Sequence, residues 1–194
     1  MKRITVFCGS RRGASTVYEE AAKALGRELA KRNITLVYGG GSVGIMGAIA
    51  ASVMEAGGEV IGVIPTFLEQ KEKSAQRITE LIVVDSMHER KAKMNELADG
   101  FITLPGGAGT LEEFFEIFTW AQLGLHEKPI GLLNVNGYYD PLIQLFQHMT
   151  DEDFLHGVFR SMVLVDDDPV RLIERFYRYT PPKVTEYLSD EEET

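Results

Sequence analysis

The sequence predicts an α/β fold with a doubly wound, Rossmann-like, mostly parallel sheet and helices on both faces. Short runs of β-branched and other apolar residues alternate with helical stretches along the chain, as in sheets built from strand–helix–strand units. The apolar runs do not alternate with polar residues, which is typical of strands buried on both faces. Seven strands are predicted, at residues 4–8, 34–38, 60–64, 81–84, 101–104, 130–133 and 162–165.

Capping signals predict where several helices begin and end. Three Ser or Thr residues are each followed, three positions later, by a glutamate, which is the spacing of a capping box at a helix start. Gly57 and Gly58 are expected to end the helix that begins near Gly44. Residues 65–80 are polar without clear periodicity, so we expect a long loop near the site there. The capping pairs are Thr16 and Glu19, Ser86 and Glu89, and Thr110 and Glu113.

Length and composition indicate one folded domain. The chain has 194 residues, which is enough for one domain with a full core. Hydrophobic residues make up 44% and charged residues 25%, and these ordinary values argue against a disordered or fibrous chain. We expect residues 1–180 to form a single Rossmann-like nucleotide-binding domain. Residues 181–194 are expected to form an acidic C-terminal tail, because residues 190–193 are all acidic.

Charge and cysteine content narrow the classes of function. The formal net charge of −9 argues against nucleic acid as a partner, because binding a polymer of phosphates needs a basic surface. A local pocket on an acidic protein can still bind one small phosphate. Cys8 is the only cysteine, which excludes an intramolecular disulfide and a multi-cysteine metal site and predicts the reducing cytoplasm. The apolar runs are too short for a signal peptide or a membrane span, so we expect no membrane partner.

Three glycine-rich loops follow predicted strands, where ligands of open α/β sheets bind. The loops are residues 9–13, 38–44 and 105–110. The second contains GxGxxG at Gly39, Gly41 and Gly44, which permits a dinucleotide-binding interpretation. However, the next strand ends in Ile64-Pro65 and lacks the acidic residue that would bind a ribose, so a tight structural turn is an alternative interpretation.

The third loop has the features of a phosphate site. Its three glycines let the backbone approach a ligand closely, and the helix that follows directs its dipole and free N–H groups at one point. A glycine-rich turn without a ligand is the alternative. No GxxxxGK[ST] motif occurs, so hydrolysis of nucleoside triphosphates is not supported.

Two charged side chains are predicted to face the interior. Arg90 falls within the apolar stripe of its helix, although it can also extend to the surface or pair with a core carboxylate. Glu113 shares a stripe with Ile117 and Trp120, so its pKa is expected to be raised toward the range of acid–base catalysis; completing a capping box is the alternative. Both Arg90 and Lys91 lie near a helix N-terminus, where a cation needs a nearby anion.

The histidines and the aromatic residues allow two further predictions. No metal-ligand spacing occurs among the four histidines, so we expect no metal and place them at the surface. The aromatic run in residues 114–120 leaves little polar face on its helix, which predicts the core on one side and another subunit on the other. The histidines are His88, His126, His148 and His156.

Two of these segments, residues 86–91 and 105–113, resemble the two signature motifs of the LONELY GUY family. Its members are cytokinin riboside 5'-monophosphate phosphoribohydrolases, and they also carry the label lysine decarboxylase-like. The resemblance extends from Cys8-Gly9-Ser10 through residues 38–41 and 119–122 to Gly137-Tyr138-Tyr139, which is most of the chain. The decarboxylase label lacks support, because no recognisable pyridoxal-phosphate lysine context occurs.

The resemblance implies hydrolysis of the N-glycosidic bond of AMP-like nucleoside 5'-monophosphates to free base and ribose 5-phosphate, in a homodimer without metal or cofactor. It assigns catalytic roles to Arg90 and Glu113. The alternative is a non-catalytic nucleotide or molybdenum-cofactor carrier with the same fold and loop, which would not need that pair. The substrate-binding residues expected on this basis are Ser10, Gly41, Glu72, Lys91, Gly106, Gly107, Gly109, Thr110, Glu112 and Thr119.

Overall fold

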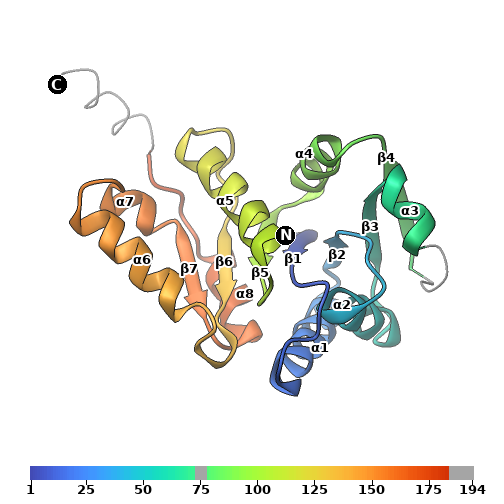
Figure 1. The fold of residues 1–194 in the computed structure, drawn as a ribbon. Coiled ribbons are helices and arrows are strands. Elements are labelled where there is room, and N and C mark those ends of the chain that lie inside the picture. The colour runs from blue at the N-terminus through green and yellow to red at the C-terminus, as the bar shows by residue number, and fades with distance from the viewer. Residues whose placement is uncertain (73–77, 184–194) are drawn as a thin grey trace.

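The computed structural model describes residues 1–72 and 78–183, with the side chains of all of these except residues 70–72. Seven parallel strands form one sheet in the order β4-β3-β2-β1-β5-β6-β7 (Figure 1). The sheet confirms the predicted fold class, and each predicted strand is present within one residue at either end. The strands are β1 (Arg3–Phe7), β2 (Thr35–Tyr38), β3 (Val60–Pro65), β4 (Glu80–Val84), β5 (Gly100–Thr103), β6 (Ile130–Leu133) and β7 (Val163–Asp166).

Helices cover both faces of the sheet, and each face has its own core. Alternate residues of β1 point to opposite faces, so Val6 lies in one core cluster and Phe7 in the other. On the Val6 face pack α1 (Thr16–Lys31), α2 (Gly44–Glu55) and α8 (Pro169–Tyr177). On the Phe7 face pack α4 (Met87–Leu97), α5 (Ala108–Gln122), α6 (Asp140–Asp151) and α7 (Gly157–Arg160). The remaining elements are α3 (Thr66–Glu72) and the short 3-10 helix η1 (Val135–Gly137).

The helix starts confirm one capping box and correct two. Ser86 caps α4 and accepts a hydrogen bond from the Glu89 N–H at 3.1 Å, as predicted. The cap of α1 is Ser15 and not Thr16. α5 begins two residues before Thr110, with Gly107 as its N-cap, so the capping box proposed for Thr110 and Glu113 is wrong. The reason is the run of glycines, which lets the chain enter the helix earlier than the hydroxyl signal suggests.

Two further predictions differ from the structure. Residues 66–72, which we expected within a loop, form α3, whereas residues 73–77 lie outside the described residues. β4 is not buried on both faces, because it lies at the sheet edge and leaves Leu81 and Val83 exposed. The predicted acidic tail falls largely on residues 184–194, also outside the described residues. No helix in the described part of the chain is long and apolar enough to cross a membrane.

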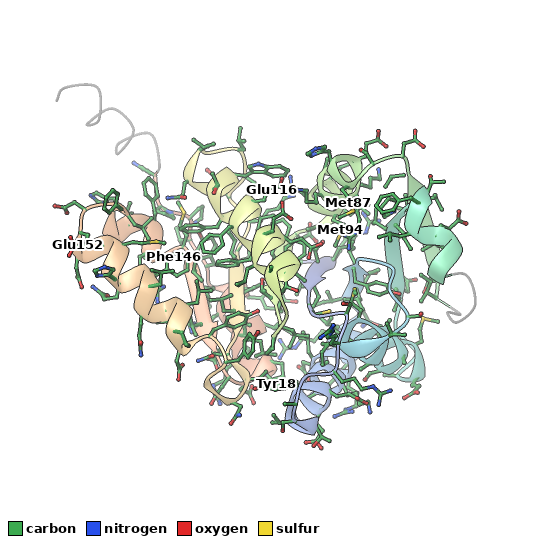
Figure 2. The ribbon with its side chains drawn as sticks, in the orientation of Figure 1. Tyr18, Met87, Met94, Glu116, Phe146 and Glu152 are labelled. Atoms are coloured by element: carbon green, nitrogen blue, oxygen red, sulfur yellow. The ribbon has the colours of Figure 1, made fainter. Side chains whose placement is uncertain are left out.

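The aromatic run of α5 packs inward and toward α6. Phe114 and Phe118 are buried, and their rings lie 6.1 and 5.3 Å from the ring of Phe146, which points from α6 toward α5 (Figure 2). Phe115 also contacts the Phe146 ring, at 5.8 Å. The predicted core side of α5 is therefore confirmed. Trp120, the fourth aromatic residue of the run, is half-buried, and the dimer stays a prediction.

His126 is buried, contrary to the predicted surface position of all four histidines. Its Nε2 donates to the Ile117 carbonyl at 2.8 Å, and its Nδ1 accepts from the Lys128 N–H at 3.2 Å. One donor and one acceptor are what a neutral imidazole supplies, and burial lowers the pKa of His126 accordingly. His126 thus joins the end of α5 to the chain before β6. The other three histidines are exposed as predicted.

The chain reverses its winding direction between β1 and β5. The two strands are hydrogen-bonded neighbours, but β1 continues into α1 on one face and β5 continues into α5 on the other. The Gly9 N–H donates to the Pro105 carbonyl at 3.1 Å, which fixes the two outgoing loops side by side. A crevice at such a switch point is where open α/β sheets bind ligands.

Candidate active site

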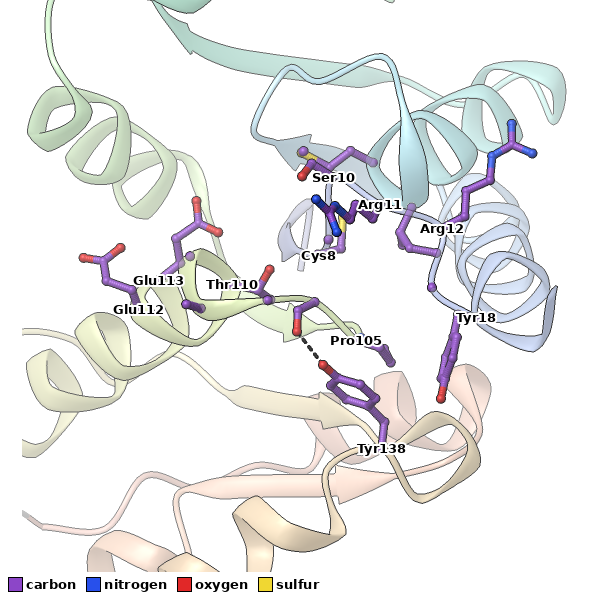
Figure 3. A pocket seen from close by; sticks show the side chains of 18 of the residues that line it. Cys8, Ser10, Arg11, Arg12, Tyr18, Pro105, Thr110, Glu112, Glu113 and Tyr138 are labelled. Carbon is purple, nitrogen blue, oxygen red and sulfur yellow. Dashed lines mark hydrogen bonds between the residues drawn. The ribbon is translucent and has the colours of Figure 1, made fainter. Parts of the chain in front are cut away.

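A pocket of about 690 Å³ opens at this switch point (Figure 3). Its size lies within the ~300–1,000 Å³ typical of sites for small molecules. The walls come from the loop 8–13 after β1, the start of α2, α3, α4, the loop 105–109 after β5, the start of α5 and Tyr138. The first and third predicted glycine loops therefore meet in one cavity.

The second predicted glycine loop, residues 38–44, contributes no lining residue among the described residues but packs against residues that do line the pocket. A Cβ on Gly44, which has a φ of +66°, would lie 2.3 Å from the Ser10 carbonyl carbon, so this glycine allows the two loops to touch. A Cβ on Gly41 would lie 2.9 Å from Met46 Cε. Ser10 and Met46 line the pocket, whereas Gly41 does not. The glycines thus serve close packing, which agrees with the structural interpretation of the GxGxxG pattern.

The start of α5 faces the pocket without a side-chain cap. The N-cap residue Gly107 makes no side-chain hydrogen bond, and its carbonyl accepts from the Thr110 N–H at 3.1 Å. Gly107 and Gly109 are exposed and line the pocket. Free N–H groups at the start of a 15-residue helix carry a partial positive charge, so this wall can hold an anion.

Thr110 and Gly106 are in close contact within that wall. A Cβ on Gly106 would lie 2.1 Å from Thr110 Oγ1, which means that only glycine leaves room for this hydroxyl. Six of the expected substrate-binding residues are brought to the pocket in this way. They are Ser10, Gly106, Gly107, Gly109, Thr110 and Glu112.

Arg90 and Glu113 form an ion pair inside the pocket. Arg90 Nη1 donates to Glu113 Oε1 at 2.9 Å, and the two side chains are only 10% and 11% exposed. Arg90 Nε donates to the Val63 carbonyl within β3 at 3.1 Å. A Cβ on Gly39 would lie 1.9 Å from Arg90 Nη2, so the guanidinium passes directly over this glycine. Arg90 therefore points inward as predicted, and its partner is the other predicted catalytic residue.

The environment of Glu113 favours a proton on its carboxylate more than water does. Burial raises the pKa of Glu113; Arg90 opposes the rise and the Glu112 charge adds to it. A carboxylic acid shifted toward neutral pH suits a general acid or base. Burial also raises the pKa of the Cys8 thiol, with a further contribution from Glu113, so this thiol is protonated at neutral pH and is a poor nucleophile.

Two further expected substrate-binding residues, Lys91 and Thr119, are not among the described residues that line the pocket, and a third, Glu72, cannot be placed relative to it. Lys91 donates from Nζ to Glu112 at 2.7 Å and pairs with Glu116 at 2.9 Å, so it ties α4 to α5. Thr119 is exposed, about 13 Å along α5 from Thr110 at 1.5 Å per residue. Glu72 ends α3, and its side chain lies outside the described residues. Their binding roles stay predictions.

Sequence patterns missed several residues that line the pocket. Leu68, Met46 and Met87 form an apolar wall, and Leu68 comes from the segment that we expected only to be near the site. Tyr18 and Tyr138 line the wall beside the α5 start. Long-range packing brings these residues together, and only Tyr138 carried a signal, within the Gly-Tyr-Tyr motif of the resemblance. Among the described residues, no group of three His, Cys, Asp or Glu side chains is placed to hold a metal ion.

The fold and the pocket define a Rossmann-like α/β protein whose ligand site combines an uncapped helix start with a buried Arg–Glu pair. Residues 46–176 match the family described as "Possible lysine decarboxylase". The chain is 48% identical to a probable cytokinin riboside 5'-monophosphate phosphoribohydrolase of Oryza sativa subsp. japonica, over 93% of this chain and 74% of the relative. It is 47% identical to such an enzyme of Arabidopsis thaliana, over 93% of this chain and 84% of the relative. The chain belongs to the family of cytokinin riboside 5'-monophosphate phosphoribohydrolases.

Solved structures of more distant proteins share the fold. A molybdenum cofactor binding protein of Rippkaea orientalis has a TM-score of 0.66 at 22% identity, covering 92% of this chain and 97% of its own. A molybdenum-cofactor carrier protein of Chlamydomonas reinhardtii has a TM-score of 0.67 at 21% identity, covering 91% and 96%. These similarities confirm the architecture.

We expect the pKa of Glu113 to lie above its usual value of 4.5 and to rise further in an Arg90→Gln variant, because the guanidinium is the largest influence that opposes the rise. Lys91→Gln is the matched control, since Lys91 opposes the rise less. A carbon-13 NMR titration of the Glu113 carboxyl measures its pKa in the wild type and in both variants. A wild-type pKa at or below 4.5, or a larger change in Lys91→Gln, would contradict this account of the pocket.

Proposed function

We propose that this protein hydrolyses the N-glycosidic bond of AMP-like nucleoside 5'-monophosphates, including cytokinin riboside 5'-monophosphates, to free base and ribose 5-phosphate. The observation that carries the proposal is the buried Arg90–Glu113 pair in the same pocket as the uncapped start of α5. The printed names of relatives that are 47–48% identical over most of the chain support it.

The start of α5 holds the 5'-phosphate. The backbone N–H groups of the Gly107–Gly109 turn and the hydroxyl of Thr110 supply donors, and the helix dipole adds favourable charge. Arg11 and Arg12 line the same pocket, and Arg11 adds positive charge there although the chain as a whole is acidic, whereas Arg12 extends outward and pairs with Glu19 at 3.5 Å (Figure 3). The phosphate thereby acts as a remote anchor, whose binding energy positions the bond that breaks.

Glu113 lies one turn of α5 beyond Thr110, where the ribose extends from an anchored phosphate. As the base departs, positive charge develops on the ribose, and a nearby carboxylate stabilises it. Glu113 also accepts a proton from the attacking water, whose hydroxyl bonds to ribose C1' as the C1'–N bond breaks, and this proton then passes to the departing base nitrogen, which leaves Glu113 as a carboxylate again. Arg90 holds the carboxylate in place and orients the nucleotide. The apolar side chains of Met46, Met87 and Leu68 suit the flat face of the base.

A carrier that binds the nucleotide or a molybdenum cofactor without turnover is the alternative, because proteins of that kind share the fold. A carrier needs an anion site but does not need a carboxylate with a raised pKa beside it. Burying an Arg–Glu pair costs free energy through the desolvation of both charges, which favours a catalytic purpose for it.

We also propose that the enzyme is a homodimer and acts in the cytoplasm. Leu123 and Leu125, at the end of α5, are 55% and 68% exposed, and Thr119 lies exposed one turn earlier. Exposed apolar side chains of this size at the end of one helix are typical of an interface. The free thiol of Cys8 fits a reducing compartment.

AMP should be cleaved and adenosine should be nearly inert, with kcat/KM lower by at least about 10³-fold, because adenosine lacks the anchored phosphate. Thr110→Ala should narrow this gap, because it should lower kcat/KM for AMP and leave any residual cleavage of adenosine nearly unchanged. The matched control is Thr150→Ala in α6, since the Thr150 hydroxyl bonds only the Phe146 carbonyl of its own helix, at 3.0 Å. Adenine release under identical conditions measures each rate. Comparable values for the two substrates would remove the phosphate assignment, and tight AMP binding without adenine release would favour a carrier.

Static light scattering at micromolar concentration should give a mass near twice 21.6 kDa. Leu125→Lys should lower the mass toward one chain, because it places a charge among the exposed apolar residues at the end of α5. Phe154→Lys serves as the control, since Phe154 is 88% exposed but lies in the turn after α6. A wild-type mass near 21.6 kDa would show that the homodimer proposal is wrong.

A further inference from the structure

Tyr138 contacts the glycine loop of the pocket from outside the α5 helix. Its hydroxyl donates to the Gly106 carbonyl at 2.6 Å, across 32 residues of sequence (Figure 3). The residue before it, Gly137, has a φ of +68°, and Asn136 has a φ of +54°. Two successive residues in the left-handed region make a sharp turn after β6, and this turn presents Tyr138 to the loop.

Neighbouring aromatic rings hold the Tyr138 ring in place. The Tyr18 ring lies 5.8 Å away and the Tyr139 ring 5.0 Å away, both edge to face. Tyr139 is buried, and its hydroxyl donates to the Leu104 carbonyl at 2.7 Å. Two consecutive tyrosines thus bind two carbonyls of the same segment. The Tyr139 bond holds the residue just after β5, whereas the Tyr138 bond holds the glycine loop that follows.

The hydrogen bond to Gly106 fixes the direction of the next N–H group. The peptide between Gly106 and Gly107 is planar and trans, so its C=O and N–H point in opposite directions. With the carbonyl directed at Tyr138, the Gly107 N–H is directed to the other side of the loop, where Thr110 lies in Figure 3. A hydrogen bond accepted by the carbonyl also polarises the peptide and makes its N–H a better donor.

Thr110 packs against Gly106 on one side of this peptide, and the Gly107 carbonyl accepts from the Thr110 N–H on the other, but Tyr138 is the side chain that binds the peptide's own carbonyl. A Cβ on Gly107 would meet no atom within 4 Å, so no side-chain packing restricts the Gly107 end of the peptide, and glycine itself allows a wide range of backbone angles. We propose that Tyr138 is a positioning residue that locks the Gly106–Gly107 peptide so that the Gly107 N–H points at the 5'-phosphate of the substrate. The inference rests on the proposed function for the identity of the anion, but the orientation itself follows from the hydrogen bond.

The experiment compares Tyr138→Phe with Tyr139→Phe, each of which removes one hydroxyl and keeps the ring. Tyr138→Phe should raise KM for AMP about 10-fold and leave kcat within about 3-fold, as expected when one hydrogen bond to a charged group is impaired. The Kd for inorganic phosphate, measured by calorimetry without any turnover, should rise by a similar factor. Tyr139→Phe should lower Tm and leave both KM and the phosphate Kd within about 2-fold.

The phosphate measurement separates this inference from the proposed reaction. If the wild type binds phosphate but releases no adenine, the proposed function fails, and a weaker phosphate Kd in Tyr138→Phe alone still supports the positioning role. An unchanged phosphate Kd in Tyr138→Phe overturns that role. So does a loss of kcat at unchanged KM, equal weakening in both variants, or a wild type that does not bind phosphate.

Discussion

The buried guanidinium of Arg90 is the constraint on which the site depends. A charge that is 8% exposed needs partners, because leaving it unpaired away from water costs several kcal/mol. Arg90 finds them on two other elements, the carbonyl of Val63 in β3 and the carboxylate of Glu113 on α5. To reach both, the guanidinium passes over Gly39, the residue just after β2, where a side chain would leave no room. One side chain therefore links the two halves of the sheet on either side of the switch point.

The anion site and the ion pair depend on each other through α5. Its uncapped start lies against the β1 loop because the Gly9 N–H binds the Pro105 carbonyl, and one turn later Glu113 meets Arg90. A shift of α5 along its axis would move the phosphate donors and the carboxylate together. Binding energy at one end of the nucleotide can therefore position the bond at the other end, which is the arrangement that remote anchoring needs.

Local patterns predicted the parts of this molecule that depend on periodicity. The apolar runs predicted all seven strands, and the apolar stripe of its helix predicted that Arg90 faces inward. Both patterns arise from the burial of side chains in the core. The capping-box interpretation of Thr110 and Glu113 failed because glycines upstream let α5 begin earlier. Other features depend on contacts between distant segments, such as Gly39 beneath Arg90, the burial of His126 and the approach of Tyr138 to Gly106. No short window of sequence contains both partners of such contacts.

The central claim is that Glu113 carries the chemistry while the rest of the pocket positions the nucleotide. The most direct measurement is adenine release from AMP by Glu113→Gln, beside Glu112→Gln, which changes the neighbouring and more exposed carboxylate. Glutamine keeps the size of the side chain and can still accept from Arg90, so Tm and AMP affinity should change little. The account predicts that kcat falls about 10²-fold or more in Glu113→Gln and much less in Glu112→Gln. Wild-type kcat in Glu113→Gln, or equal losses in the two variants, would contradict it.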